Sequence, residues 1–510
     1  KLSDECAGVL NIEQLLSEKD FRDLMELDYF CLIDRKIISD LVRAVVSRTV
    51  ATPDVALWVR QRRQGHWYQE YRHLYKAVDY AARFIHTLDN TRLDMDSLAD
   101  GIQHYCNHWY QLDQLYRKFT YHVRMSGQAS LMGNLTDQIE NLYTNNFLLK
   151  TGDRFQTFVD QAKEWKAPPI KKQSAFFEHW VQKPFLRKGN KVCIIISDAL
   201  RYEIGEELMT LIRQEDRYSA EIESFLGLLP SYTQLGMAAL LPNTELVISE
   251  NESSAVLVDG KPSQGTANRI KILEQAGSFR ATACKANDLM AMKKEDCRAL
   301  VRDHDVMYIY HNRIDLTGDK RESEEQVFEA VEETLQELIR LIKKLTGANA
   351  NNLLVTSDHG FIYQHRAIEE SDYVSLQPSV ISRQPSAISR QNSDVSSPLS
   401  EEGCCLYVDR RFILGKHLSE NSSLHTFTSE QLGLGGEVEV QIPKSINRLR
   451  LKGSGSRFVH GGATLQEVVI PVLKINKKRQ SDVSAVDVDI LRGGSSMITS
   501  GQVAVTLYQS

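Results

Sequence analysis

Three short runs of apolar residues between positions 192 and 359 each end in acidic side chains. They are Val192–Asp198, Val306–Asp319 and Leu353–His359. Runs of this length, rich in β-branched residues, are typical of parallel strands buried on both faces, and ligands of open α/β sheets bind outside the carboxyl ends of such strands. A lone Asp after a strand is usually a helix N-cap, but several ligand-type residues at three strand ends predict a shared site. The residues are Asp198, Asp315, Asp319, Asp358 and His359.

Between residues 188 and 476, runs of strand length alternate with helical patterns. The clearest helix is expected from Glu322 to Leu345, with acidic residues at its start and two lysines near its end. Its apolar stripe consists of Val327, Val331, Leu335, Leu338, Ile342 and Leu345. Alternation of this kind indicates βα units, so we predict an α/β fold with a mostly parallel sheet flanked by helices.

Two further regions flank this core, and an insertion interrupts it. Residues 1–187 carry apolar residues at spacings of three and four, which predicts an α-helical N-terminal domain. Residues 477–510 return to alternation and predict the start of a small β-rich C-terminal domain. Residues 377–400 are rich in Ser, Gln and Pro and contain the tandem repeat PSVISRQ and PSAISRQ. That composition is typical of a flexible insertion.

The overall composition is that of an ordinary globular protein with several domains. The 510 residues are 42% hydrophobic and 25% charged, with a net charge of −6, so charge alone does not indicate a nucleic-acid partner. Eight cysteines without CxxC or zinc-finger spacing indicate free thiols and a cytoplasmic location. No stretch approaches the roughly 18 apolar residues of a membrane span. Because the chain begins without Met or a signal peptide, we expect a fragment.

All five tryptophans lie in the helical region, beside basic clusters such as Arg60, Arg62 and Arg63. Aromatic and basic residues together can bind a nucleic-acid backbone. On helices, the same mixture more often means buried rings next to a solvated charged face. We favour the second interpretation.

A hydroxyl group in the position of a nucleophile follows the first strand. In LLPSYTQLGMAALLP, Pro230 and Ser231 turn the chain and Thr233 opens an apolar helical run. A Thr in the first turn of a helix beside a metal has its hydroxyl acidified by the cation, and backbone N–H groups there favour phosphate. Thr233 is therefore the candidate nucleophile. The alternative role for Thr233 is a helix N-cap.

Other polar residues near these runs have weaker claims. Arg201 and Asn312, each close to a strand end, are candidates for substrate binding, although caps and solvated charges are common at such positions. Glu467 is a candidate for supporting a metal ligand, and the alternative role is a cap for the helix or strand that follows. A basic run at mostly strand spacing either steers a polyanion toward the site or forms an exposed strand face. The run consists of Arg448, Arg450, Lys452 and Arg457.

The functional residues follow a fixed order along the chain. It is Asp198, Thr233 in PSYT, Asp315-x-x-Gly318-Asp319, Asp358-His359-Gly360 and His460 in HGGATLQEVVIP. This order resembles the alkaline phosphatase superfamily, which includes nucleotide phosphodiesterases and cofactor-independent phosphoglycerate mutases. More closely, ISDALRYEIGEEL, LPSYTQLGMAALLP, YHNRIDLTGD, TSDHGFIY and HGGATLQEVVIP resemble the PglZ family of bacterial phage-exclusion (BREX) systems. The resemblance implies an alkaline-phosphatase-like core at 188–476.

The resemblance also implies two divalent metal ions, about 4 Å apart, that clamp the attacking and leaving oxygens of an in-line phosphoryl displacement. The implied ligands are Asp198, Asp358 and His359 for the metal that activates Thr233, and Asp315, Asp319 and His460 for the second metal. Thr233 would form a covalent phospho-threonine intermediate that water then hydrolyses.

One position departs from the superfamily pattern. Where its members usually have Gly-His, this chain has Gly318-Asp319, which replaces a nitrogen ligand by a hard carboxylate. Zn²⁺ is the metal that the resemblance implies, but a carboxylate at this position weakens zinc selectivity and favours Mn²⁺ or Mg²⁺.

Two hypotheses about function follow. In the first, the protein is a metal-dependent phosphodiesterase or nuclease that acts on nucleic acid, or on another phosphodiester, during phage exclusion. In the second, it is a scaffold with structural metals that joins a DNA methyltransferase-like protein and an ATPase. Thr233 favours the enzyme, since a structural metal site needs no hydroxyl at a helix start. Asp319 and the large flanking regions favour the scaffold.

Overall fold

A six-stranded sheet forms the centre of the molecule. The computed structural model describes residues 2–251, 253–374, 404–451, 455–481, 488–491 and 506–509. The strand order is β2-β17-β8-β1-β7-β6. The strands are β2 (Tyr218–Leu226), β17 (Val469–Lys477), β8 (Asn352–Thr356), β1 (Val192–Ser197), β7 (Val306–His311) and β6 (Ala281–Lys285). Strands β8, β1, β7 and β6 are mutually parallel, whereas β17 runs antiparallel to both of its neighbours.

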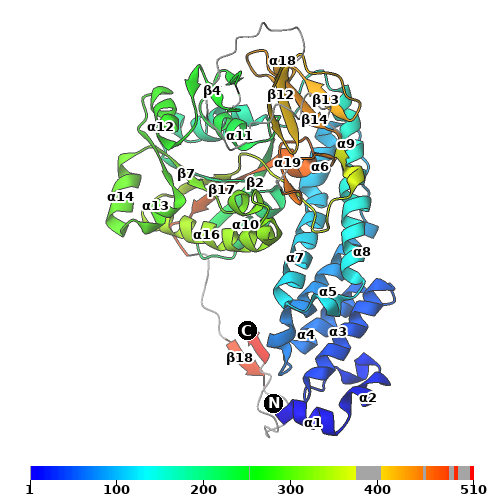
Figure 1. Cartoon of the computed structure of the whole chain (residues 1–510). Coiled ribbons are helices and arrows are strands. Elements are labelled where there is room, and N and C mark those ends of the chain that lie inside the picture. The colour runs from blue at the N-terminus through cyan, green and yellow to red at the C-terminus, as the bar shows by residue number, and fades with distance from the viewer. Residues whose placement is uncertain are drawn as a thin grey trace, which may run out of the picture.

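The predicted α/β fold with a mostly parallel sheet is confirmed. Every residue of β1 is buried, as expected for a central parallel strand that is covered on both faces. Helices flank the sheet in Figure 1. They are α10 (Tyr202–Arg213), α11 (Thr233–Ala239), α12 (Thr266–Gln275), α13 (Ala286–Ala291), α14 (Lys294–Asp303), α15 (Ile314–Gly318) and α16 (Val327–Gly347). The predicted apolar stripe of α16 is buried, although the α-helix begins at Val327, after a short 3-10 turn at Glu324–Gln326.

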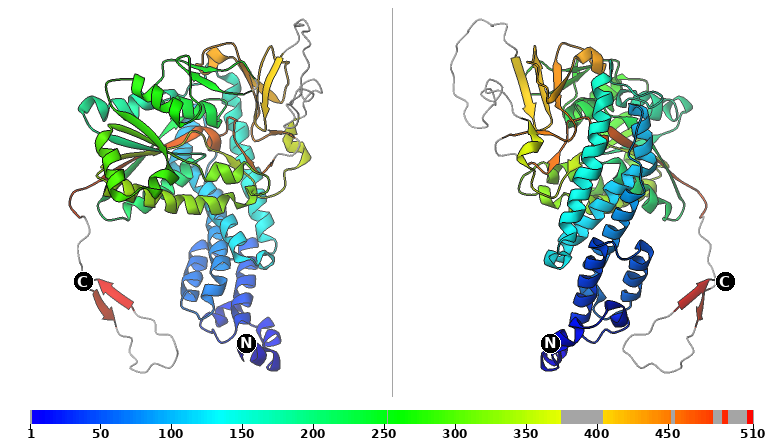
Figure 2. Two further views of the ribbon diagram at one scale, coloured as in Figure 1. Left: turned by 60° about the vertical axis from the view of Figure 1, so that its left-hand side comes forward. Right: turned by 90° about the vertical axis from the view of Figure 1, so that its right-hand side faces the viewer.

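The region before β1 is helical, in agreement with the sequence pattern. Its α-helices are α1 (Leu2–Val9), α2 (Ile12–Ser17), α3 (Cys31–Val46), α4 (Thr52–Arg62), α5 (Tyr68–Asp89), α6 (Leu98–His104), α7 (Tyr110–Ser126), α8 (Leu135–Asn141) and α9 (Lys150–Gln161). Figure 2 shows this region as an elongated body that extends away from the sheet. Trp109, Trp165 and Trp180 are buried, and Arg62 forms a buried ion pair with Asp34. These residues support the core-aromatic interpretation of this region.

A buried charge network joins the helical region to the α/β core. The guanidinium of Arg117, on α7, donates to Glu203 of α10 at 2.9 and 3.0 Å and to Glu332 of α16 at 2.7 Å. Arg201 donates to the same Glu203 at 2.7 Å. Although burial alone would raise it, these two arginines hold the pKa of Glu203 below its usual value. The helical region is therefore anchored to α10, the helix that follows the first acidic strand end.

The chain also forms a second, smaller sheet outside the central one. It is antiparallel, with the order β11-β12-β14-β13, and α18 (Ser429–Leu432) lies beside it. Its strands are β11 (Cys404–Asp409), β12 (Phe412–Lys416), β13 (Leu424–Phe427) and β14 (Glu439–Pro443). Short strands complete the fold: β3 (Leu246–Ile248), β4 (Val256–Val258), β5 (Lys261–Pro262), β9 (Ile362–Tyr363), β10 (Tyr373–Val374), β15 (Arg448–Leu449) and β16 (Phe458–Val459). A short helix, α19 (Leu465–Val468), leads into β17.

Two of the predicted segments fall largely outside the described residues. The predicted insertion at 377–400 does so entirely. In the predicted C-terminal domain at 477–510, the structure describes the antiparallel pair β18 (Val488–Leu491) and β19 (Thr506–Gln509). Among the described residues, none of the helices is both long and apolar enough to cross a membrane.

Candidate metal centre

The candidate nucleophile lies at the start of α11, at the carboxyl edge of the central sheet. Tyr232 occupies the N-cap position and Thr233 is the first helical residue, so the Thr233 hydroxyl is not used as a cap. Instead, Thr233 Oγ1 lies 3.1 Å from His359 Nε2. Gly236 brings the helix this close, because a Cβ at that position would clash with the backbone of Asp358. The side chain of Thr233 is only partly buried.

The first group of ligand atoms comes from the ends of β1 and β8. Asp198 follows β1, and Asp358 and His359 follow β8, which pairs directly with β1. His359 Nε2 lies 3.5 Å from Asp198 Oδ1 and 3.5 Å from Asp358 Oδ2. All three side chains are buried. Adjacent parallel strands thus bring together donors that are far apart in the chain.

The backbone around these carboxylates is held by hydrogen bonds. Asp358 Oδ1 accepts from the N–H of Ala199 at 3.2 Å and from the N–H of His359 at 3.0 Å. Ala199 has a φ of 60°, which is rare for a residue with a Cβ. Strained backbone of this kind is concentrated at functional sites, where the surrounding structure over-determines it.

The second group joins Asp315, on α15, to His460, which follows β16. His460 Nε2 lies 3.6 Å from Asp315 Oδ1. The ring of His460 stacks on that of His359, with centroids 4.1 Å apart and planes at 21°. One ligand atom from each of Asp315, His359 and His460 lies within 4.8 Å of the others, and the same is true of Asp198, Asp358 and His359. His359 therefore connects two adjacent candidate sites.

The buried carboxylates of the centre would be stabilised by bound cations. Burial, together with the charges of Asp358 and Asp315, raises the pKa of Asp198 well above its usual value. Burial also raises the pKa of Asp315 to about 6, and it lowers the pKa of His460 well below its usual value. Neutral imidazole is the form of histidine that binds metals. Clustered carboxylates without a cation are costly, because like charges repel strongly in a buried site.

Several ligand-type atoms in the centre have no hydrogen-bond partner among the described residues. They are Asp198 Oδ1, Asp358 Oδ2, Asp315 Oδ1 and His460 Nδ1. Buried polar atoms are normally paired, so four orphans in one place indicate a missing partner. Carboxylate oxygens with two imidazoles are suitable donors for Zn²⁺ or Mn²⁺. The residues therefore fit a pair of divalent metal sites.

The sequence of the core matches a known family. A family described as the BREX system PglZ alkaline phosphatase-like domain matches residues 176–388 and 384–475, more than half of the chain. The chain belongs to this PglZ family. The resemblance inferred from the motifs is thereby confirmed.

Named relatives of the family are similar to most of this chain. The chain is 34% identical over 469 residues to the alkaline phosphatase-like protein BrxZ of Escherichia coli O9:H4 (strain HS), covering 89% of this chain and 51% of the relative. It is 31% identical over 503 residues to the alkaline phosphatase-like protein PglZ of Bacillus cereus (strain H3081.97), covering 96% and 55%. The chain thus spans about half the length of these relatives.

The solved structures that match part of this chain do so with low sequence identity. Murine ectonucleotide pyrophosphatase/phosphodiesterase 5 is 13% identical, with a TM-score of 0.36 over 56% of this chain and 88% of that protein. Phosphonoacetate hydrolase from Sinorhizobium meliloti 1021 is 13% identical, with a TM-score of 0.32 over 56% and 89%.

Asp319, predicted as a ligand of the second metal, is placed differently from the other five ligand candidates. It belongs to neither of the two groups of ligand atoms, and its side chain is 55% exposed. Its carboxylate forms an ion pair with Arg410, a residue between β11 and β12 that also donates to the carbonyl of Phe458 at 3.1 Å. Arg410 was not among the residues predicted from the sequence. The available signal was the pair Arg410-Arg411 at a turn between two β-rich runs.

Neither of the two candidates for substrate binding contacts Thr233 among the described residues. Arg201 is fully buried, pairs with Glu203 and lies over the ring of Phe361 at 4.6 Å. Asn312 is exposed, and its side-chain oxygen accepts from the N–H of Leu316 at 3.0 Å, which caps α15. These contacts give both residues structural roles.

Glu467 supports the loop that carries His460. It is fully buried and accepts from Arg411 at 2.7 and 3.0 Å, from the N–H of Gly462 at 2.8 Å and from the Thr464 hydroxyl at 2.8 Å. Arg411 in turn donates to backbone carbonyls, including that of Ser445 at 2.9 Å. The predicted supporting position of Glu467 agrees with these contacts, which fix the turn just after His460.

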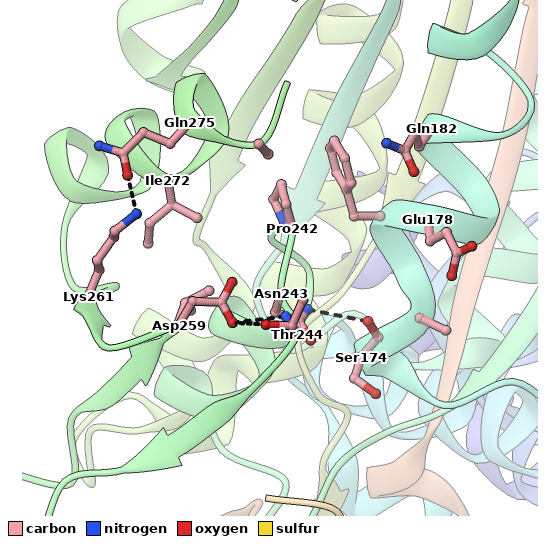
Figure 3. A pocket seen from close by; sticks show the side chains of 14 residues that line it. Ser174, Glu178, Gln182, Pro242, Asn243, Thr244, Asp259, Lys261, Ile272 and Gln275 are labelled. Atoms are coloured by element: carbon pink, nitrogen blue, oxygen red, sulfur yellow. Dashed lines mark hydrogen bonds between the residues drawn. The ribbon is translucent and has the colours of Figure 1, made fainter. Parts of the chain in front are cut away.

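A separate hollow lies beyond the C-terminal end of α11 (Figure 3). It has a volume of about 390 Å³. Its polar side chains bind one another: the Thr244 hydroxyl donates to Asp259 at 2.6 Å, and Lys261 donates to Gln275. None of the candidate metal ligands lines it. We therefore place the chemistry at the strand ends and not in this hollow.

Proposed function

We propose that this chain contains the catalytic core of a metal-dependent phosphohydrolase, a phosphodiesterase or nuclease, in BREX phage defence. The observation that carries the proposal is the 3.1 Å approach of Thr233 Oγ1 to His359 Nε2. The hydroxyl belongs to a partly buried side chain at the start of a helix, and it lies beside the Nε2 atom of His359, a member of the first ligand group. A purely structural metal site has no use for such a hydroxyl.

The residues divide the proposed reaction between them. The Thr233 hydroxyl loses its proton to solvent and Oγ1 attacks phosphorus. The bond to phosphorus forms as the bond to the leaving oxygen breaks, the leaving oxygen departs with the bonding electrons, and a phospho-threonine ester results. Bound divalent metal ions would acidify the hydroxyl and offset the negative charge of the phosphoryl oxygens. Asp198, Asp358 and His359 would hold one ion, and Asp315, His359 and His460 surround the place of the second. Water then cleaves the ester and regenerates Thr233.

The proposed metals are Zn²⁺ or Mn²⁺, with Mg²⁺ as a further alternative. Two histidines among the donors favour Zn²⁺ or Mn²⁺ over Mg²⁺, which prefers oxygen ligands. From the sequence, Asp319 is expected to complete the second site. In this structure its carboxylate is engaged by Arg410, so ligation by Asp319 would require that ion pair to open.

The proposed partners are nucleic acid, or another phosphodiester, as substrate and other BREX components, such as a methyltransferase-like protein and an ATPase. Family membership supports the BREX context. None of the eight cysteines forms a disulfide bond in the described part of the chain, which supports the proposed cytoplasmic location.

Hydrolysis by the purified, metal-stripped protein tests the proposal. We expect a chromogenic bis-aryl phosphodiester to be hydrolysed after Zn²⁺ or Mn²⁺ is restored. Thr233→Ala is expected to abolish turnover with little change in melting temperature, and Thr233→Ser to retain part of it. The scaffold hypothesis predicts the converse: Thr233→Ala is silent, while Asp198→Ala or Asp358→Ala unfolds the core. Absence of turnover with every metal, despite tight metal binding, would favour the scaffold.

A further inference from the structure

A small pocket lined by arginines lies beside the second group of ligand atoms. We call it the arginine pocket, and its lining includes Arg410, Arg448, Arg450, Tyr373, Ser456 and Val459. Val459 directly precedes the metal-ligand candidate His460 in the chain. The cavity measures about 30 Å³, which is room for one or two oxygen-sized groups and too little for a nucleobase.

Backbone contacts join the segments that line this pocket. Tyr373 on β10 pairs with Arg448 on β15, and the N–H of Leu449 donates to the carbonyl of Arg410 at 2.7 Å. Arg410 reaches the metal centre from here: its charge acts on both Asp315 and His460. Arg410 thus both lines the pocket and acts electrostatically on the second candidate metal site.

Arg448 is a buried cation without a matching anion. Only 1% of the residue is exposed, and its guanidinium donates to the Ser456 carbonyl and the Gln364 side-chain oxygen, both neutral acceptors. Its Nε has no hydrogen-bond partner among the described residues. The charges of Glu467 and Asp372 act to raise its pKa, but they do not outweigh the effect of burial. Burial and the nearby charge of Arg411 lower the pKa of Arg448 to about 9. An unpaired buried charge is costly, so the structure retains a cation that an anion would stabilise.

The neighbouring Arg411 is a buried arginine that does have a paired carboxylate. It is equally buried, but its guanidinium forms a bidentate ion pair with Glu467. Arg450, at the mouth of the pocket, stacks on Tyr373 at 4.3 Å and pairs with the exposed Glu370. Exposed pairs of this kind contribute little and open readily. Arg448 and Arg450 are thus available to an incoming anion, whereas Arg411 is not.

We propose that the arginine pocket binds the non-bridging oxygens of a backbone phosphate adjacent to the scissile phosphate of an oligonucleotide. The inference rests on the proposed phosphodiesterase function and names its substrate class: a nucleic-acid strand with at least two consecutive phosphates. Guanidinium groups recognise phosphate in this way because their N–H donors match phosphoryl oxygens. The basic run predicted from the sequence therefore steers a polyanion through Arg448 and Arg450, with Arg448 buried rather than on an exposed strand face.

Binding of a fluorescein-labelled single-stranded 12-mer to the full chain tests this proposal directly. With Thr233→Ala as the parent, so that no turnover occurs, we expect Arg448→Met to raise Kd about tenfold. The slope of log K against log salt is expected to fall by about 0.7, the value for one single-strand phosphate contact. Arg450→Ala is expected to raise Kd about threefold. It provides a second test of the pocket if Arg448→Met does not fold. Kd and salt slope unchanged in both variants would overturn the proposal.

Arg457→Met is the matched control. Arg457 belongs to the same basic run, but it pairs with Glu325 and does not line the pocket, so we expect Kd within twofold of the parent. With Thr233 intact, Arg448→Met is expected to lower kcat/KM for the oligonucleotide tenfold more than for the bis-aryl diester, which has one phosphate. An equal loss on both substrates would contradict a subsite for an adjacent phosphate. If the protein with Thr233 intact hydrolyses neither substrate, the proposed function fails, and the binding data on the Thr233→Ala background still test the pocket.

Discussion

Replacing Asp315 by Asn is expected to stabilise the metal-free protein, although it removes a candidate metal ligand. In the folded chain, burial raises the pKa of the Asp315 carboxyl from 3.8 to about 6, and the charges of Asp358 and Asp319 add to the effect. Because the folded pKa lies above the unfolded one, the wild type loses stability as pH rises from about 4 to about 6 and regains none above it. At pH 8 the loss is ~3 kcal/mol, from roughly two pKa units at 1.36 kcal/mol each. The amide of the Asp315→Asn variant carries no charge and avoids this loss.

The assay is thermal unfolding in excess chelator at pH 8 and pH 4.5. For a core of this size, ~3 kcal/mol corresponds to about 6 °C in Tm. We expect Asp315→Asn to melt about 6 °C higher than the wild type at pH 8, with the advantage falling to about a third at pH 4.5. Asp319→Asn is the matched control: that carboxylate is half-exposed and paired with Arg410, so its removal should give no stabilisation. An Asp315→Asn variant that is no more stable than the wild type at pH 8, or whose advantage does not shrink in acid, would refute the reasoning.

Two further substitutions test how the centre is built. Gly236→Ala places a methyl group against the Asp358 backbone, so it should lower the free energy of unfolding by about 1–3 kcal/mol and remove most of the diester hydrolysis. Gly347→Ala is the control: it has open space around it and should be nearly neutral in chemical denaturation. Glu467→Gln leaves Arg411 buried without its anion and should destabilise the core by about 3–5 kcal/mol. Thermal unfolding followed by circular dichroism checks both Gly236→Ala and Glu467→Gln. Melting curves that match the wild type would contradict both assignments.

The strand ends could be predicted from sequence because their signal is local. The runs that became β1, β7 and β8 are continuous and apolar. Asp198 follows β1 directly and Asp358 follows β8 after one residue, whereas Asp315 lies beyond the end of β7, on α15. The place of β17 between β2 and β8 depends on pairing between segments more than 100 residues apart, and no local pattern reports it. The antiparallel sheet that carries Arg410 was missed for the same reason, and with it the ion pair to Asp319.

The site itself was only partly accessible to sequence reasoning. His460 follows a two-residue strand and was proposed through family resemblance rather than through any periodicity. Arg201 looked like a phosphate ligand because it follows a strand end, but the helical region supplies Arg117 and Asp113 around it and buries it. Contacts between regions of the chain decide such roles, and a linear pattern does not contain them.

Detection of a covalent adduct on Thr233 is the most direct test of the proposed mechanism. The metal-loaded protein would be mixed with a bis-aryl phosphodiester, quenched in acid within a single turnover and digested for mass spectrometry. We predict an aryl-phosphoryl group on the peptide that contains Thr233, and none in Thr233→Ala. Hydrolysis that proceeds with Thr233 unmodified, or that survives in Thr233→Ala, would contradict the account.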